Sequence, residues 1–346
     1  MIKVGIIGST GMVGEGLIQT ILGHPQAKIT FLGSRHAAGR NIQEVLPKLR
    51  GTLDQTCEEV TTEGLIESSD VVFLASKTPE VMALVPPLLE AGRKVIDIGA
   101  QFRMKSAETY EAHYGTEHLC PELLERAVYG LPELFREQIK GADLVANPGC
   151  YATTAILAIA PLVASGVAAD GPIPIDAFSG LSGAGRTYNE TNLFVHCNEN
   201  VKGYKLGTHR HTPEMEQVIE EVSGRPRRVI FFPHVVPLDR GIYSTSFLDT
   251  TEKLAQGDVL AIYRDFYEGE AFVRITDDPS LIDLQGVRDT NLCDISIFAD
   301  PGSNKVMVFS ATDNMIKGAS GQAVQNMNLM FGYPEDEGLR QLAIYP

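Results

Sequence analysis

Short apolar segments alternate with helix-length segments up to Ala146, and this alternation constrains the fold more than any other feature of the sequence. The apolar segments are Lys3–Gly8, Lys28–Gly33, Asp70–Ala75, Lys94–Gly99 and Asp143–Ala146. The clearest helical segments are Gly14–Leu22 and Pro79–Ala91. Strands that are apolar throughout are typical of a parallel sheet covered by helices on both faces. We therefore predict an α/β domain of βαβ units, a fold that binds ligands outside the carboxyl ends of its strands.

The pattern changes after Cys150, where several strands show alternating polarity. The predicted strands are Pro174–Ser179, Arg228–Pro233, Ile242–Asp249, Ala271–Ile275, Asp294–Asp300 and Lys305–Thr312. The predicted helices are Ala152–Ser165, Pro213–Val222, Leu254–Tyr267 and Ser320–Phe331. A strand-rich sheet with few helices predicts an α+β domain, and we expect the last helix to pack on the first domain. The predicted domains are residues 1–148 with 315–346, and residues 149–314.

Composition excludes several classes of protein. Lys and Arg number 29 against 44 Asp and Glu, so the formal net charge is −15. An acidic chain of this kind disfavours nucleic acid and anionic membranes as partners, and no run of about 18 apolar residues is present to span a bilayer. The N-terminal segment is too rich in Gly for a signal peptide and is interpreted as a strand and turn. Five scattered cysteines without a Cys-x-x-Cys pair predict neither disulfides nor a Cys-rich zinc site, which fits the cytoplasm.

A glycine-rich turn follows the first predicted strand and precedes the first helix. Its residues, all candidates for cofactor binding, are Gly8, Ser9, Thr10, Gly11, Met12, Val13 and Gly14. Glycines at this spacing let the backbone approach a pyrophosphate, and the helix N-terminus attracts its negative charge. Such turns also occur without a ligand, but the position in the first βαβ unit favours a dinucleotide.

The end of the second predicted strand indicates which dinucleotide is bound. An NAD enzyme carries an acid there, which accepts a hydrogen bond from the ribose 2′-OH. This chain has Ser34 and Arg35, with Arg40 nearby. A hydroxyl and a guanidinium suit a 2′-phosphate, so NADP(H) is the predicted cofactor; the alternative is a solvated surface arginine.

Cys150 is the candidate nucleophile. It follows Asn147-Pro148-Gly149 and lies in the first turn of the predicted apolar helix, whose dipole favours a thiolate over a thiol. A thiolate at this position can attack a carbonyl while neighbouring N–H groups receive the oxyanion. The other four cysteines are interpreted as buried structural residues.

The segment Tyr204–Glu214 concentrates polar chemistry. His209 and His211 are candidates for the general base, and Lys205 and Arg210 for holding an anionic substrate. In an extended segment both histidines would share one face. Thr212 is the predicted N-cap of the following helix, with Pro213 as its first residue. His-x-His without a defined acid or Cys partner is weak evidence for a metal, and we predict none.

Three further segments carry candidate residues. Arg103 lies just past the end of the fourth predicted strand, where phosphates bind. The loop after the strand Pro174–Ser179 contains Ser182, Gly183 and Arg186 and is able to line a cleft. Asn314 lies between the last strand and the last helix, and its amide is able to pair with a carboxamide.

These residues resemble the N-acetyl-gamma-glutamyl-phosphate reductases, the arginine-pathway members of the aspartate-semialdehyde dehydrogenase-like group. The resemblance runs nearly end to end. Its most specific elements are Asn147–Tyr151, Ser182–Arg186, and Asn198–Lys202 leading into Gly207–Glu214. It implies a Rossmann NADP-binding domain joined to an α+β catalytic and oligomerisation domain, in a homo-oligomer (dimer or tetramer) in the cytoplasm. It also implies that N-acetyl-gamma-glutamyl phosphate is reduced by NADPH, through a cysteine thioester, to N-acetylglutamate semialdehyde and phosphate.

The resemblance assigns roles residue by residue. The nucleophile falls on Cys150, and the base on His209 or His211, of which His209 is preferred. The resemblance also implies that Arg103 binds the substrate phosphate and that Asn314 lies on the nicotinamide side of the site. Three alternatives stay open: the homologous aminoadipyl-phosphate reductase of lysine biosynthesis, an aspartate-semialdehyde dehydrogenase, and a non-catalytic nucleotide-binding regulator.

Overall fold

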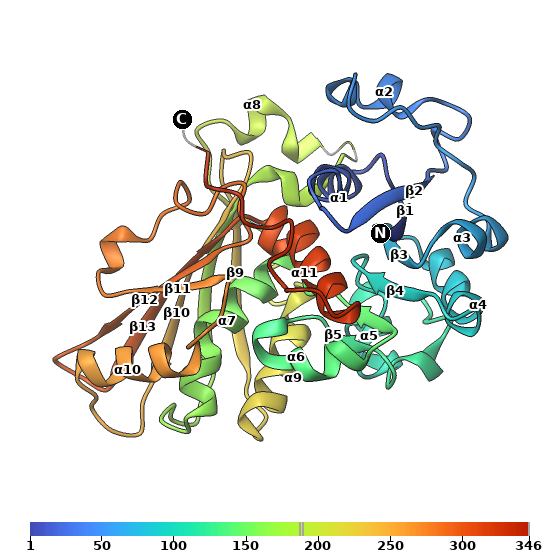
Figure 1. Cartoon of the computed structure of the whole chain (residues 1–346). Helices are drawn as coiled ribbons and strands as arrows, with labels where there is room; N and C mark the ends of the chain where they lie inside the picture. Colours follow the sequence, from blue (N-terminus) through green and yellow to red (C-terminus); the bar gives the residue numbers. More distant parts are fainter. Residues whose placement is uncertain (187, 189, 345–346) are drawn as a thin grey trace. The chain divides into compact units, whose positions relative to one another are not determined.

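The computed structural model describes residues 1–186, 188 and 190–344 (Figure 1). The chain forms two compact units. The first contains Met1–Pro148 and Ala319–Arg340, and the second contains Gly149–Gly318 and Gln341–Pro346.

The first unit, described in full, is built on a parallel sheet of six strands. The strands are β1 (Ile2–Ile7), β2 (Ala27–Gly33), β3 (Val71–Leu74), β4 (Lys94–Asp97), β5 (Val128–Tyr129) and β6 (Leu144–Ala146). Their order is β2-β1-β3-β4-β6-β5. All four residues of β3 are buried, as both-face coverage requires. The predicted Rossmann-type α/β fold is therefore confirmed.

The first unit also contains helices, most of which pack against strands of this sheet. They are α1 (Met12–Leu22), α2 (Ile42–Val45), α3 (Thr62–Ser68), α4 (Val85–Glu90), α5 (Ala107–Tyr114), α6 (Pro132–Gly141) and α11 (Gly321–Met330). Short 3-10 turns are η1 (Pro47–Leu49), η2 (Pro79–Leu84) and η3 (Pro121–Leu123). Every residue of α11 is buried, and the helix packs against α1 and α6, as predicted.

One predicted helix is wrong in detail. The sequence predicts a single helix over Pro79–Ala91, whereas the structure has η2 followed by α4. Pro86 and Pro87 lie in the first turn of α4, and a proline there has no N–H to bond to the preceding turn. The prolines therefore start a new helix rather than continue the old one.

The second unit contains a mixed sheet of seven strands within its described residues. They are β7 (Ile173–Ser179), β8 (Lys202–Gly203), β9 (Val229–Val235), β10 (Ile242–Asp249), β11 (Val273–Thr276), β12 (Cys293–Ala299) and β13 (Lys305–Thr312). Their order is β11-β12-β13-β10-β7-β9-β8. The pairs β7–β9 and β11–β12 are parallel, and the other pairs are antiparallel. The predicted α+β class is confirmed.

Helices pack on one face of this sheet. They are α7 (Cys150–Ala164), α9 (His211–Ser223) and α10 (Gln256–Phe266), while α8 (Phe194–Cys197) lies in a long connection. Shorter turns are η4 (Leu181–Ala184), η5 (Glu190–Asn192), η6 (Pro279–Leu281) and the π-helix η7 (Ile316–Ser320). The apolar helix α7 contacts β10 and β13 and is the centre of the core (Figure 1).

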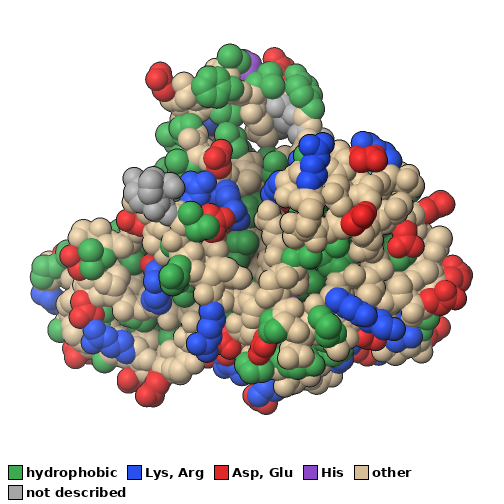
Figure 2. Space-filling model, turned by 45° about the horizontal axis from the view of Figure 1, so that its top comes forward, with side chains coloured by type: hydrophobic (Ala, Val, Ile, Leu, Met, Phe, Trp, Pro, Cys, Tyr) green, Lys and Arg blue, Asp and Glu red, His purple; other side chains and the backbone are tan. Residues whose placement is uncertain are grey.

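The other face of the sheet is not covered by these helices. Residues of β10 alternate between buried and accessible, and Phe247 is among the accessible ones. Hydrophobic side chains also gather at the top of the view in Figure 2, over the segment that carries α8, where Phe194 and Val195 are exposed.

Within the part of the chain that the structure describes, no helix combines the length and the apolar character needed to cross a membrane.

Candidate active site

The turn between β1 and α1 admits only glycine at two positions. Gly8 has φ +81°, and a Cβ on it would lie 2.5 Å from the carbonyl oxygen of Ala75. A Cβ on Gly14 would lie 2.3 Å from the carbonyl oxygen of Gly8. Gly11 is the N-cap of α1 and has no side chain to occupy the first N–H groups of the helix. A tight turn followed by a helix N-terminus without a side-chain cap is the arrangement that binds a pyrophosphate, so these residues fit the predicted cofactor.

The end of β2 lies against this turn. The N–H groups of Gly8 and Ser9 donate to the carbonyl of Gly33, and the hydroxyls of Thr10 and Ser34 are 3.2 Å apart. Arg35 is exposed, and its Nη2 lies 3.1 Å from Oε2 of Glu80. The structure therefore brings Ser34 to the glycine turn. Arg35, the next residue, forms an ion pair with Glu80.

Arg103 is buried in the first unit. Its Nε donates to the carbonyl of Asn147 at 2.7 Å, and its Nη2 to the carbonyl of Ile98 at 3.1 Å. The nearby carboxyl of Asp97 is also buried; burial raises its pKa to about 6, although N–H groups and Arg103 oppose the shift. The guanidinium thus holds together the chain segments that leave β4 and β6.

Cys150 lies in the first turn of α7, as predicted; it is the first residue of the helix and is half-buried. The N–H of Gly149, its N-cap residue, donates to Oε1 of Glu214 at 2.7 Å. A Cβ on Gly149 would lie 2.4 Å from Nε2 of His211, so the imidazole packs directly on this glycine. The Pro-Gly segment therefore holds Cys150 at a helix N-terminus beside His211 and Glu214.

His211 is the first residue of α9, and Glu214 follows one turn later on the same face. The prediction that Thr212 caps this helix is wrong. Arg210 occupies the N-cap position with φ −62° and ψ −15°, and the N–H of Thr212 already donates to the carbonyl of His209. The chain turns before Thr212, so the extended geometry expected for His209–His211 does not occur.

His209 is buried in an aromatic cage next to His211. The two imidazole centroids are 4.7 Å apart, and Tyr151, Tyr204 and Phe231 approach His209 edge-on. Its Nδ1 accepts the N–H of His211 at 3.1 Å. Burial, followed by the charges of Arg210 and Lys205, lowers the pKa of His209 to about 3. The ring is therefore neutral near pH 7, with its proton on Nε2.

Lys205 and Arg210 therefore lie close enough to His209 to act on its charge. Lys205 has φ +48° and is exposed, whereas Arg210 is half-buried. Arg186 is exposed and follows Gly185, whose φ is +80°.

Two tyrosines adjoin the same cluster. Burial raises the pKa of Tyr204 to about 12, and the charge of Cys150 also raises it. The hydroxyl of Tyr151 donates to the carbonyl of His234 at 2.9 Å. Both phenols stay protonated at neutral pH, so they are hydrogen-bond donors there.

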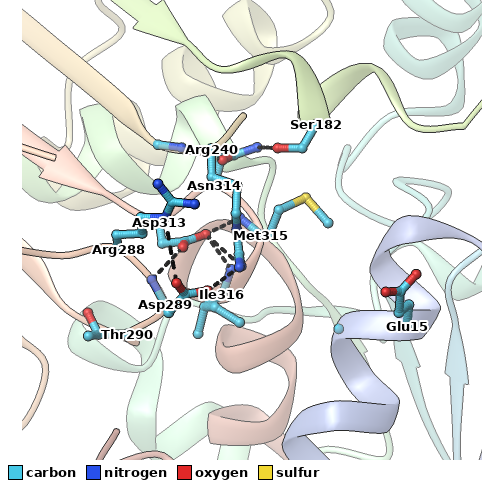
Figure 3. A network of polar contacts seen from close by, with 12 residues as sticks. Glu15, Ser182, Arg240, Arg288, Asp289, Thr290, Asp313, Asn314, Met315 and Ile316 are labelled. Atoms are coloured by element: carbon cyan, nitrogen blue, oxygen red, sulfur yellow. Dashed lines mark hydrogen bonds and ion pairs between the residues drawn. The ribbon is translucent and has the colours of Figure 1, made fainter. Parts of the chain in front are cut away.

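Asn314, Ser182 and Gly183 come together, as Figure 3 shows for the first two. Nδ2 of Asn314 donates to the hydroxyl of Ser182 at 2.9 Å and is 3.7 Å from the Cβ position of Gly183. The segment that follows Asn314 reaches Cys150, because a Cβ on Gly318 would lie 2.6 Å from Cβ of Cys150. The segment Asn314–Gly318 thus extends from the Ser182 hydroxyl at one end to the candidate nucleophile at the other.

Sequence reasoning missed Glu214. A glutamate in the first turn of an amphipathic helix is usually exposed, yet this one is fully buried. Its spacing of three residues from His211 is a signal that could have revealed it, because both then share a helix face.

Two family models match the chain. One, described as semialdehyde dehydrogenase, NAD binding domain, matches residues 3–142. The other, described as semialdehyde dehydrogenase, dimerisation domain, matches residues 150–314. N-acetyl-gamma-glutamyl-phosphate reductases from Desulforudis audaxviator and Citrifermentans bemidjiense are 44% and 45% identical, over all of both chains. This chain belongs to the N-acetyl-gamma-glutamyl-phosphate reductase family. The predicted family is confirmed.

Solved structures of more distant proteins have the same fold. An aspartate semialdehyde dehydrogenase with NADP from Candida albicans has a TM-score of 0.71 at 19% identity, covering 96% of this chain and 98% of that one. An aspartate semialdehyde dehydrogenase II from Vibrio cholerae, complexed with ASA, has a TM-score of 0.71 at 17% identity, with coverage of 96% and 98%.

Proposed function

We propose that this chain reduces N-acetyl-gamma-glutamyl phosphate to N-acetylglutamate semialdehyde and phosphate with NADPH, a step of arginine biosynthesis. The single observation that carries the proposal is the placement of Cys150. It lies at the N-terminus of α7, next to Gly149, which contacts both His211 and Glu214, in a chain of this reductase family. We also propose that the first unit binds the cofactor and the second carries the chemistry.

Cys150 performs the first step. Its thiolate, stabilised by the helix dipole, attacks the acyl carbon, and the bond to the phosphate oxygen breaks with its electron pair leaving on phosphate. The result is a thioester on Cys150. N–H groups at the start of α7 stabilise the oxyanion that forms during the attack.

NADPH, when bound, supplies the hydride that reduces the acyl group. As the hydride adds, His211 donates a proton to the acyl oxygen and a thiohemiacetal forms on Cys150. His211 takes the same proton back as the carbon–sulfur bond breaks, the aldehyde leaves and the electron pair returns to sulfur as the Cys150 thiolate. We prefer His211 over His209 for this transfer because His211 packs on Gly149, next to the sulfur-bearing residue. His209 already uses Nδ1 as an acceptor and has a pKa near 3, so it is a poor base and a good hydrogen-bond donor.

The cofactor is proposed to bind at the glycine turn, with Gly8, Gly11 and Gly14 admitting the pyrophosphate. Ser34 and Arg35 would bind the 2′-phosphate. Arg35 pairs with an exposed glutamate, Glu80, and an exposed ion pair is weak enough to exchange for a phosphate. Ser182, Gly183 and Asn314 are proposed to bind the carboxamide.

The cofactor preference has a direct test. Arg35→Ala should weaken NADPH binding by about 2 kcal/mol, the scale of a charge-assisted contact, and leave NADH binding nearly unchanged. Glu80→Gln is the matched variant and should leave NADPH binding equal or stronger. An equal loss for both cofactors in Arg35→Ala would show that Arg35 does not bind the 2′-phosphate.

The substrate is proposed to be held by four basic residues, namely Arg103, Arg186, Lys205 and Arg210. Arg210 and Lys205 lie near His209, where they would attract an anionic substrate. Arg103 is proposed for the phosphate because it follows the carboxyl end of β4.

A substrate panel tests the proposed activity. Phosphate-dependent reduction of NADP should be fastest with N-acetylglutamate semialdehyde, slower with its one-carbon-longer homologue, and slowest with aspartate semialdehyde. A preference for the longer aldehyde would favour the lysine-pathway activity. Tight NADP binding without turnover of any aldehyde would identify a regulator.

We further propose that two copies assemble in the cytoplasm through the open face of the second unit's sheet. Ile230, Phe232, Phe247 and Phe298 are each between 41% and 42% exposed on that face. Phe247 and Phe298 both lie opposite Met307, on either side of β13. A matching dimerisation domain supports a homo-oligomer. None of the five cysteines takes part in a disulfide.

A further inference from the structure

Asp313 is a fully buried carboxylate that gathers four donors (Figure 3). Its Oδ1 accepts the N–H groups of Met315 at 2.7 Å and Ile316 at 3.1 Å, and its Oδ2 accepts the N–H of Asp289 at 2.7 Å. The fourth donor is Nη2 of Arg240, 3.2 Å from Oδ1. Backbone N–H groups carry no net charge, so three of them do not neutralise a buried carboxylate. The guanidinium of Arg240 supplies the positive charge that does.

Arg240 connects three loops at one end of the sheet. Its Nη1 bonds Asp289, between β11 and β12, and its Nη2 bonds Asp313, after β13. Its backbone packs closely against the loop after β7. A Cβ on Gly180, in that loop, would lie only 2.7 Å from the backbone nitrogen of Arg240. The N–H of Ser182 donates to the carbonyl of Asp239 in the same contact.

The residue after Arg240 sets the orientation of the Asn314 amide. The N–H of Gly241 donates to Oδ1 of Asn314 at 2.7 Å. With its oxygen held there, the amide must direct Nδ2 to the Ser182 hydroxyl, 2.9 Å away. Each amide nitrogen carries two N–H bonds, so one remains to donate to a carbonyl. Arg240 therefore fixes both ends of this arrangement, through Asp313 on one side and Gly241 on the other.

We propose that Arg240 is a positioning residue that sets the Asn314 amide and the Ser182 hydroxyl for the cofactor's carboxamide. This proposal rests on the proposed function. Arg240 touches neither cofactor nor substrate in this role. Its guanidinium fork is needed because it bonds two carboxylates in different directions, which a lysine ammonium with one point of charge does less well.

The test distinguishes binding of the cofactor's nicotinamide carboxamide from binding of its ADP-ribose 2′-phosphate portion. Variants Arg240→Ala and Arg240→Lys are compared with Arg288→Ala, a control that removes an exposed arginine 3.6 Å from Asp289. Two ligands are titrated by calorimetry: NADPH, and 2′-phospho-ADP-ribose, which lacks nicotinamide. The fluorescence anisotropy of bound NADPH reports how firmly its ring is held. Phosphate release from the acyl phosphate without cofactor reports acylation of Cys150.

The expected results are specific to positioning. Arg240→Ala should bind NADPH about tenfold more weakly, the cost of one lost hydrogen bond, and bind 2′-phospho-ADP-ribose as wild type does. Anisotropy of bound NADPH should fall and kcat should drop about 10²-fold, while the phosphate burst from Cys150 is retained. Arg240→Lys should recover part of each loss, and Arg288→Ala should match wild type.

Two results would overturn the proposal. Arg240→Ala with unchanged NADPH affinity and anisotropy would show that the arginine does not position the carboxamide site. Equal loss of both ligands together with the phosphate burst, in Arg240→Lys as well, would show a purely structural role. Wild-type protein that binds NADPH and gives no phosphate burst would instead refute the proposed function, and this proposal with it.

Discussion

His209 and His211 are two residues apart, but their imidazoles meet different surroundings. His211 packs on Gly149, beside Cys150, whereas His209 is enclosed by aromatic rings and accepts a backbone N–H. A general base must reach its proton and hold it near the working pH. His211 meets the first condition by position, and His209 fails the second because its pKa is about 3.

This difference predicts the outcome of two substitutions. His211→Asn should lower kcat by about 10²–10⁴-fold, the usual effect of losing a general acid–base group, and should flatten the pH–rate profile. His209→Asn should lower kcat less and leave the shape of the pH–rate profile unchanged. The asparagine amide still donates a hydrogen bond, and His209 is proposed to act as a donor rather than as a base. Steady-state kinetics from pH 5 to 9 would decide. A normal His211→Asn and a crippled His209→Asn would assign the base to His209.

The same pKa shift makes folding stability depend on pH. The unfolded chain protonates His209 near pH 6.5, whereas the folded chain does so only near pH 3. Stability from this group is therefore complete above pH 6.5 and is lost as the pH falls toward 3. At pH 5 the loss relative to pH 7 should be about 2 kcal/mol. Urea unfolding of wild type and His209→Asn at both pH values measures it. If wild type loses no more unfolding free energy between pH 7 and pH 5 than His209→Asn does, the lowered pKa of His209 is contradicted.

At the scale of elements, the segment Pro148–Gly149 places the start of α7 against the start of α9. A Cβ on Gly149 would enter the space of the His211 ring. Gly149→Ala should therefore push the imidazole away and lower kcat at least tenfold, with NADPH affinity unchanged. Gly257→Ala in α10 is the matched control, because nothing lies within 4 Å of its Cβ position. Equal activity of both variants would show that this contact does not set the geometry of the site.

The sequence predicted elements well where one pattern dominated. The strands over Ile242–Asp249 and Lys305–Thr312 have the predicted bounds, because burial on one face repeats every second residue. The helix over Pro79–Ala91 was wrong because local proline chemistry outweighs apolar spacing. The cap at Thr212 was wrong because the chain turns two residues earlier than the Thr-Pro pair indicates.

The candidate site was predictable only in part. Cys150 was identified because its helix start can be read from Pro148 and Gly149. Glu214 and Asp313 were missed because each is an acid that tertiary contacts bury. Spacing from His211 offers a local signal for Glu214, whereas the burial of Asp313 depends on contacts with a distant loop. Arg240 was missed because its partners come from loops far away in the chain.

At the scale of the whole molecule, a chain with a net charge of −15 repels its own copies. An assembly must therefore bury enough apolar surface to offset the repulsion, and the open sheet face offers aromatic side chains on neighbouring strands. The sheet face is therefore favoured over charged surfaces as the interface between copies.

The assembly has a simple test. Phe247→Lys should shift the protein from twice the mass of one chain toward a single chain in light scattering, because an interface core does not accommodate an unpaired charge. Leu119→Lys, an exposed leucine of the first unit, is the control and should not change the mass. An unchanged dimer in Phe247→Lys would place the interface elsewhere.

Cys150 is the proposed nucleophile, and one measurement tests its role directly. Wild type and Cys150→Ser are mixed with N-acetyl-gamma-glutamyl phosphate, first without cofactor and then with NADPH, while phosphate release and NADPH oxidation are followed. We predict a stoichiometric phosphate burst and full turnover in wild type. In Cys150→Ser, which still binds NADPH, we predict no burst and a kcat lower by several orders of magnitude, because a serine hydroxyl does not ionise at this position. A variant that keeps more than about a tenth of the activity would contradict the assignment of Cys150.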